Sequence, residues 1–138
     1  MLSLEEVRQV VMTTFKSVHD VYYPTMLVNY PNFVVVDLEH QIDPFITVEL
    51  DFDKTPQAAL GEKEINVHGT LIVYFYYRIG TGMSGAYDYT DTLNEYLGMS
   101  LIDSIKYQAV SVNNIVSFPG WEGVMNSVVF DVVKGLEC

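Results

Sequence analysis

Hydrophobic residues recur at two different spacings along the chain, and the first spacing is that of a helix. Intervals of three and four residues predict an amphipathic helix over about residues 4–19, with these hydrophobic positions: Leu4, Val7, Val11, Phe15 and Val18. Ser3 followed by Glu6 forms a capping box at its start. Pro24 and Pro31 then interrupt regular hydrogen bonding, so an extended linker is expected after this helix.

Strict alternation replaces the helical spacing in "PFITVELDFD". One face of the predicted strand carries Ile46, Val48, Leu50 and Phe52, and the other face carries Thr47, Glu49, Asp51 and Asp53. A β-rich run over about residues 64–79 is long enough to pair antiparallel with this strand, with a bulge or bend expected at Gly69. The β-branched "FVVVDL", residues 33–38, predicts a further short strand.

The last third of the chain predicts one more helix and two closing strands. The helix is expected to begin at Asp88 or Thr90 and to stop at Gly98, and the strands are expected in "SIKYQAVSV" and "GVMNSVVFDVV". We find no repeat and no internal boundary. The sequence therefore predicts one α+β domain over residues 1–138, a mostly antiparallel sheet with an N-terminal helix and a second helix packed on it.

A complete G-x-G-x-x-G lies at Gly80, Gly82 and Gly85, between the long predicted strand and the second helix. A dinucleotide fold places this motif on the first strand, turn and helix of a parallel sheet, with an acidic residue about 20 positions further on. Too little chain follows Gly85 for the remaining parallel strands and crossover helices. We therefore interpret these glycines as suppliers of positive φ in a sharp strand-to-helix turn, with no cofactor.

Net charge, hydropathy and cysteine content disfavour several classes of function. The net charge is −11, from 18 acidic against 7 basic side chains. This charge disfavours a protein that binds nucleic acid tightly, but it allows DNA to pass transiently along an acidic surface. No apolar run reaches the roughly 18 residues needed to span a bilayer, and the N-terminus has charges where a signal peptide is apolar, so we expect a soluble protein made in the cytoplasm. The single cysteine, Cys138, excludes an intrachain disulfide and a thiolate metal cluster.

Few side chains are candidates for metal binding or ligand binding. Glu49, Asp51 and Asp53 could share a divalent cation, or they could form a solvated or pore-facing acidic edge. The three histidines, His19, His40 and His68, lack the spacing that would place two ligands on one helix face. Trp121, in "FPGWEG", is either an exposed binding residue or a turn tryptophan folded back over the core. We expect no catalytic or metal-binding residue and no enzymatic activity.

The order of these features resembles the tail terminator, or tail completion, proteins of long-tailed bacteriophages. The resemblance rests on the N-terminal helix, "YPNF", "PFITVEL", the glycine-spaced loop after "GTLIVYFYYRIGTGMSGA", the second helix and the late "PGWEGVMNSVVFDV". It covers about residues 7–133, although Phe45 stands where relatives more often have Trp. The resemblance implies a subunit of a six-fold ring on the head-proximal end of the tail tube. Its partners would be copies of itself, the tail tube protein and the head–tail connector protein.

Residues for these contacts can be named from the pattern. Aromatic rings on both sides of the long strand exceed what a small helix layer covers, and the loop from Asp53 to Lys63 is long enough to dock onto a tube protein. The interface candidates are Asp53, Lys54, Gln57, Lys63, Tyr76, Tyr77, Arg78 and Trp121. Glu49, Asp51 and Asp53 are candidates for an acidic lumen that DNA crosses without sticking. The alternatives are another neck component, such as a head-closure or adaptor protein, or a small nucleotide- or ligand-binding domain that uses Gly80–Gly85.

Overall fold

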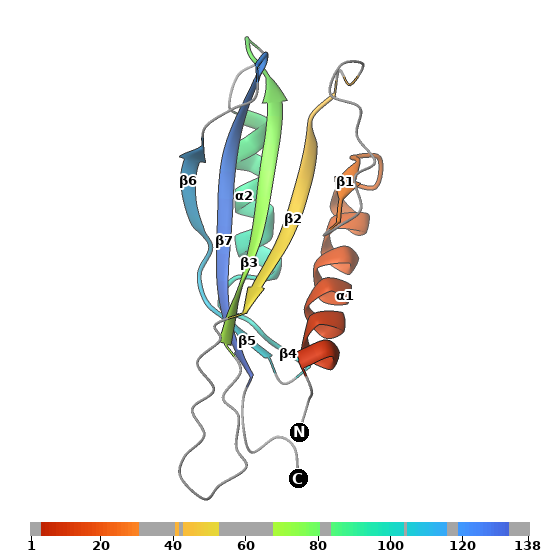
Figure 1. The fold of residues 1–138 in the computed structure, drawn as a ribbon, viewed down its shortest axis with the longest axis vertical. Coiled ribbons are helices and arrows are strands. Elements are labelled where there is room, and N and C mark those ends of the chain that lie inside the picture. The colour runs from red at the N-terminus through yellow and green to blue at the C-terminus, as the bar shows by residue number, and fades with distance from the viewer. Residues whose placement is uncertain are drawn as a thin grey trace, which may run out of the picture.

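The computed structural model describes residues 4–30, 41, 43–52, 68–80, 84–103, 105–115 and 119–132. Two helices and seven strands follow one another along these residues (Figure 1). In chain order they are α1 (Leu4–Tyr22), β1 (Val28–Asn29), β2 (Phe45–Phe52), β3 (His68–Arg78), α2 (Ser84–Tyr96), β4 (Leu101–Ile102), β5 (Ile105–Tyr107), β6 (Ser111–Ile115) and β7 (Trp121–Val132).

All seven strands belong to one sheet in the order β1-β2-β3-β7-β5-β4, and β6 also pairs with β7. The pairings are antiparallel, except that the two residues of β1 run parallel to β2. Both β5 and β6 lie against the same side of β7, at opposite ends of that long strand, since Tyr107 pairs with Phe130 and Ser111 with Ser127. The predicted α+β fold with a mostly antiparallel sheet is confirmed.

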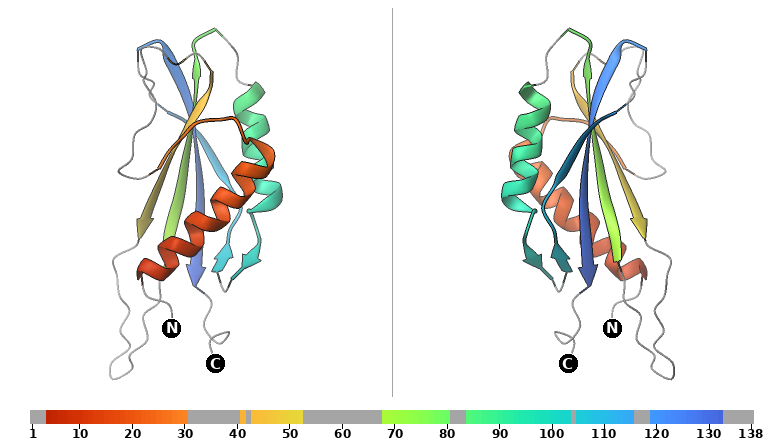
Figure 2. Two further views of the ribbon diagram at one scale, coloured as in Figure 1. Left: turned by 90° about the vertical axis from the view of Figure 1, so that its right-hand side faces the viewer. Right: turned by 90° about the vertical axis from the view of Figure 1, so that its left-hand side faces the viewer.

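Both helices cover the same face of the sheet, and the core lies between them and the strands (Figure 2). Val7, Val11 and Phe15 of α1 are fully buried there, as the helical spacing predicted. The alternation in β2 is also confirmed, because Ile46 and Val48 point into this core while Glu49 and Asp51 are exposed on the other face. α1 runs three residues beyond the predicted end at His19, so this histidine lies within the helix.

Two expectations about glycine positions are corrected. Gly69 causes no bulge, because β3 keeps an unbroken register through it, opposite Phe52 on one side and Phe130 on the other. The second helix begins at Ser84, earlier than predicted, so Gly85 lies in its first turn and has no positive φ. Gly80 does have the expected positive φ, 93°, in the turn after β3. Buried Ala86 explains the early start, because α2 packs on the sheet from its first turn.

Several predictions lie outside the described residues: the capping Ser3, the strand over residues 33–38, His40, the loop from Asp53 to Lys63, Gly82 and Cys138. The described helices include none that is both long enough and apolar enough to cross a membrane.

Candidate interaction surface

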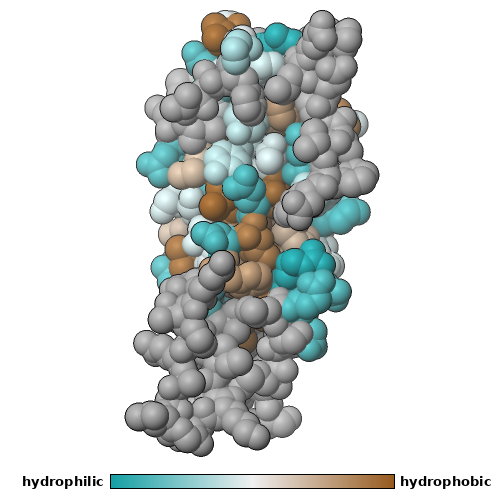
Figure 3. All heavy atoms as spheres, in the orientation of Figure 1, coloured by the Kyte–Doolittle hydropathy of each residue, from teal (hydrophilic) through white to brown (hydrophobic). Residues whose placement is uncertain are grey.

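The face of the sheet opposite the helices, which we call the helix-free face, carries a partly exposed hydrophobic group. Alternate residues of β3 and β7 point to this side, and their register places Tyr74 opposite Met125 and Thr70 opposite Val129. The apolar strip, as we name it, consists of Ile72, Tyr74, Met125 and Val129. Val129 is 39% exposed and the other three are half-buried. Figure 3 views this face and shows hydrophobic side chains gathered at its centre.

Acidic side chains lie beside the apolar strip on β2. Glu49 and Asp51 are both exposed on the helix-free face, as the alternation predicted. The Tyr74 hydroxyl donates a hydrogen bond to Glu49 Oε2 at 3.4 Å, which connects the strip to its acidic border. Nowhere in the described ranges do three His, Cys, Asp or Glu side chains gather as metal ligands, so the shared-cation alternative gains no support from them.

Three aromatic residues form a packed cluster at the Phe45 end of the same face. The ring centroid of Phe45 lies 5.2 Å from that of Tyr76 and 5.0 Å from that of Trp121. Phe45 and Trp121 are 1% exposed and Tyr76 is 8% exposed. Burial, with smaller contributions from Tyr74 and Glu49, raises the pKa of Tyr76 to about 12. Of the two alternatives for Trp121, the structure shows the packed one.

The interface candidates on the long strand are therefore occupied inside the chain. Tyr77 points to the opposite face, is 3% exposed, and donates a hydrogen bond to Glu122 Oε2 at 3.1 Å. The guanidinium of Arg78 lies 4.6 Å from the Trp121 ring centroid and donates from Nη2 to the Gln41 carbonyl at 2.8 Å. Neither these side chains nor Tyr76 and Trp121 offer a broad free surface. The apolar strip, which no local sequence pattern indicated, is one surface that a partner could contact.

A histidine and a carboxylate meet at the far end of the helix-free face. His68 and Asp131 are directly opposite each other on β3 and β7, and His68 Nδ1 forms a hydrogen bond with Asp131 Oδ1. Gln108 Nε2 donates to the second carboxylate oxygen at 3.5 Å. No spacing in the sequence signals this pair, because its members are 63 positions apart. The contacts described here are those of a cross-strand pair.

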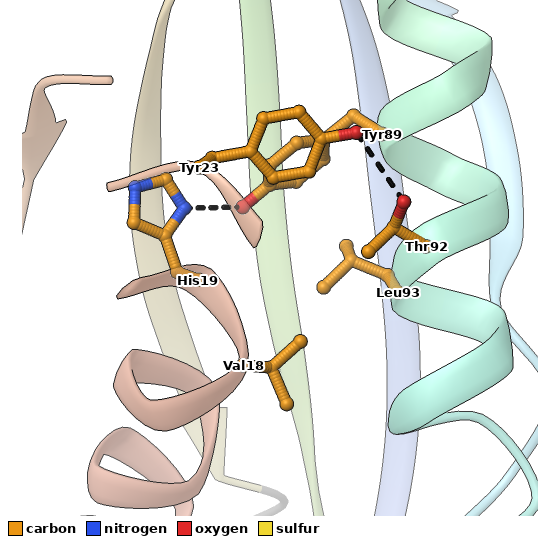
Figure 4. Close-up of a pocket in the computed structure, with 6 residues that line it drawn as sticks. All are labelled: Val18, His19, Tyr23, Tyr89, Thr92 and Leu93. Carbon is orange, nitrogen blue, oxygen red and sulfur yellow. Dashed lines mark hydrogen bonds between the residues drawn. The ribbon is translucent and has the colours of Figure 1, made fainter. Parts of the chain in front are cut away.

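The space between the helices is closed by side chains (Figure 4). The Tyr89 hydroxyl of α2 lies 3.0 Å from His19 Nδ1, and His19 Nε2 lies 3.2 Å from the Met26 carbonyl oxygen. Since a carbonyl can only accept, Nε2–H donates to Met26 and Nδ1 accepts from Tyr89. Burial lowers the pKa of His19 and raises the pKa of Tyr89. The lining residues leave no room for a water molecule, so this is a junction between the helices and not a ligand site.

The glycine motif has no phosphate-binding geometry in the described residues. Both neighbours of β3 in the sheet, β2 and β7, run antiparallel to it, whereas a dinucleotide site forms between parallel strands. Gly80 instead provides a turn, in which Ile79 N–H donates to the Gly120 carbonyl at 3.1 Å. Gly120 itself has a positive φ of 85°.

Comparisons with known proteins establish the fold alone. No protein-family model matches the chain, and no curated protein matches it either. A solved structure known only by a sequence identifier is similar, with a TM-score of 0.74 and 14% identity over 96% of each chain. At this identity the similarity defines a shared α+β architecture and assigns no activity.

Proposed function

We propose that this chain is a structural virion protein of a long-tailed bacteriophage. In this proposal, six copies form a ring on the head-proximal end of the tail tube, stop tube polymerisation, and present their other face to the head–tail connector. The proposal assigns no chemical reaction and no cofactor to the chain. The observation that supports it best is the helix-free face, whose apolar strip is left without a covering helix.

The apolar strip fits an assembly protein for a physical reason. Soluble monomers expose few contiguous apolar patches, and larger ones mark surfaces that another protein covers. Both helices lie on the opposite face, so Ile72, Met125 and Val129 would be covered only by a partner or by parts of the chain outside the described residues. A ring subunit has such partners in its neighbours, the tube and the connector.

The charge of the chain fits the passage of DNA through the ring. With a net charge of −11, the surface repels phosphate, and Glu49 and Asp51 place two exposed carboxylates on one strand. If that strand faces the lumen, DNA would cross without sticking during ejection. A ring structure with these two carboxylates on its outer rim would remove the lumen role and leave the capping role intact.

Electron microscopy of particles that lack the gene tests the proposal. Loss of a terminator gives overlong or unjoined tails, because nothing stops the tube. Loss of a head-closure or adaptor protein instead gives free tails of normal length and leaky heads, and that result would overturn the proposal. Complementation with the wild-type chain should restore joined tails of normal length. Complementation with an Ile72→Glu chain should not, provided that its thermal melting matches the wild type.

A further inference from the structure

One border of the described sheet is the uncharged strand β6, whose outer edge pairs with no other described strand. Among the described strands β6 pairs only with β7, and Figure 1 shows it at the outer margin of the sheet. Its sequence, Ser-Val-Asn-Asn-Ile, contains neither a charged residue nor proline, and Ser111, Val112 and Asn113 are exposed. Natural proteins usually protect such an edge with charges, proline or a bulge, because its free N–H and C=O groups pair with other strands.

At the opposite border of the described sheet, a segment of β2 of equal length has no described strand on its outer side. β1 pairs with β2 only at Ile46 and Thr47, so residues 48–52 pair with β3 alone among the described strands. The left view of Figure 2 shows this part of β2 at the rim of the sheet. This second open segment has five residues, as β6 has.

We propose that β6 of one copy pairs with residues 48–52 of β2 in the next copy, so that the sheet continues from subunit to subunit. The strand directions permit it. β2, β3, β7 and β6 alternate in direction across the sheet, so a β2 strand placed beyond β6 continues the antiparallel order. The contact joins two different edges and is head-to-tail, which is the kind of contact that builds a ring when its rotation closes.

The side chains on the two edges are complementary in this arrangement. In this arrangement the helix-free faces of the two copies are aligned. Ser111 and Asn113 of β6 then lie on the same side of the sheet as the two β2 carboxylates, Glu49 and Asp51. On the other side of the sheet, Val112 lies beside Leu50. Hydroxyl and amide donors then face carboxylate acceptors, and an apolar side chain faces another. Pairing β2 with a second β2 would instead bring carboxylates together. The partner that fits β6 best is therefore the β2 edge of a second copy.

This inference rests on the proposed ring, and it is tested by self-association alone. We expect sedimentation velocity of the wild-type chain to show assembly that increases with concentration. Ser111→Glu with Asn113→Glu places like charges opposite Glu49 and Asp51, and it should weaken association by at least about tenfold. Adding Glu49→Lys and Asp51→Lys to that variant should restore association, because opposite charges then face each other.

A matched control adds the same charge elsewhere. Gln9→Glu with Thr13→Glu, at two exposed positions of α1, should associate like the wild type. Circular dichroism should show that every variant keeps its fold. Association that survives the β6 substitutions, or that the β2 substitutions fail to restore, would overturn the edge contact, as would a wild-type chain that stays monomeric at its highest soluble concentration. None of these results bears on tail length in the gene-deletion experiment, so the proposed function stands or fails separately.

Discussion

Gly69 lies directly opposite Phe130, and the phenyl ring occupies the space that a side chain at position 69 would need. A Cβ built on Gly69 would lie less than 3.0 Å from two ring atoms of Phe130 and 2.9 Å from the Asp51 carbonyl oxygen. The glycine therefore allows a phenylalanine to lie across β3 and to pack edge-on to Phe52, with ring centroids 6.0 Å apart. This close approach explains a glycine inside a regular strand.

We expect Gly69→Ala to lower the free energy of unfolding by about 1–3 kcal/mol, because the added methyl group must displace the ring or the backbone. Urea unfolding measures the change. Phe130→Leu should recover part of the loss when it is added to Gly69→Ala, since it removes the ring but not the Asp51 carbonyl. The control is Gly85→Ala, whose Cβ would meet only Phe75 at 4.0 Å. This helix substitution should be neutral or stabilising by up to about 1 kcal/mol. Equal effects at both glycines would contradict the steric explanation.

Trp121 is the only tryptophan of the chain, so fluorescence reports its environment directly. Because it is 1% exposed, we expect emission at short wavelength and little quenching by acrylamide until the protein unfolds. Trp121→Ala should destabilise the chain by about 3–5 kcal/mol through loss of packing with Phe45. Red-shifted, readily quenched emission from the native monomer would show instead that the ring is exposed to a partner.

His19 should make stability depend on pH below neutrality. Its pKa in the folded protein is lowered by burial, so the unfolded chain binds the proton more readily. The stabilisation from neutral His19 is complete above the unfolded pKa of about 6.5 and is lost as the pH falls toward the lower folded pKa. Urea midpoints from pH 8 to pH 5 should therefore fall more steeply for the wild type than for His19→Asn. Parallel curves for the two proteins would contradict this assignment.

The buried hydrogen bond between Tyr89 and His19 should stabilise the protein more than the half-buried one between Tyr23 and Thr92. Tyr89→Phe removes the donor to a buried imidazole nitrogen, which we expect to cost about 1–3 kcal/mol of unfolding free energy. Tyr23→Phe is the matched control, because the same hydroxyl is removed from a half-buried 3.3 Å contact with Thr92. Its cost should stay below about 1 kcal/mol. Thermal melting of both variants in one buffer compares them.

The apolar strip should matter for assembly and not for folding. Val129→Ser changes a side chain that is 39% exposed, so we expect its unfolding free energy to stay within about 0.5 kcal/mol of the wild type. The same variant should complement a gene deletion poorly, as judged by the fraction of joined particles. Val21→Ser, at a 69% exposed position of α1, should complement fully. If the two variants complement equally, the strip is not a contact surface.

The sequence could predict α1, β2, β3 and β7, because each depends on local spacing. The single strand expected in "SIKYQAVSV" was wrong, since the structure divides it into β5 and β6, and the short strands β1 and β4 were not predicted. The helical spacing of Val7, Val11 and Phe15 predicted α1 and its buried face. The alternation from Ile46 to Phe52 predicted β2 and its buried face. The same alternation put Glu49 and Asp51 together on the opposite face. Gly80 was correctly assigned a positive φ, because a turn directly after a strand needs one.

The candidate surface could not be predicted in this way. Tyr76 and Tyr77 looked like surplus aromatic area, but Tyr76 packs against Phe45 and Tyr77 donates to Glu122, both distant from them in sequence. Trp121, for which the sequence left two alternatives open, also packs against Phe45. The apolar strip and the His68–Asp131 pair depend on the register of β3 with β7, and no local pattern encodes that register.

By itself, then, the sequence determined the α+β class, the N-terminal helix, the half-buried strand and the acidic character of the chain, since composition and short-range periodicity carry that information. Only the tertiary structure decided that both helices cover one face, that Phe130 lies over Gly69, and that β6 and residues 48–52 of β2 lie at opposite margins of the described sheet. Those outcomes depend on contacts between residues far apart in the chain, and such contacts are fixed by packing the whole core at once.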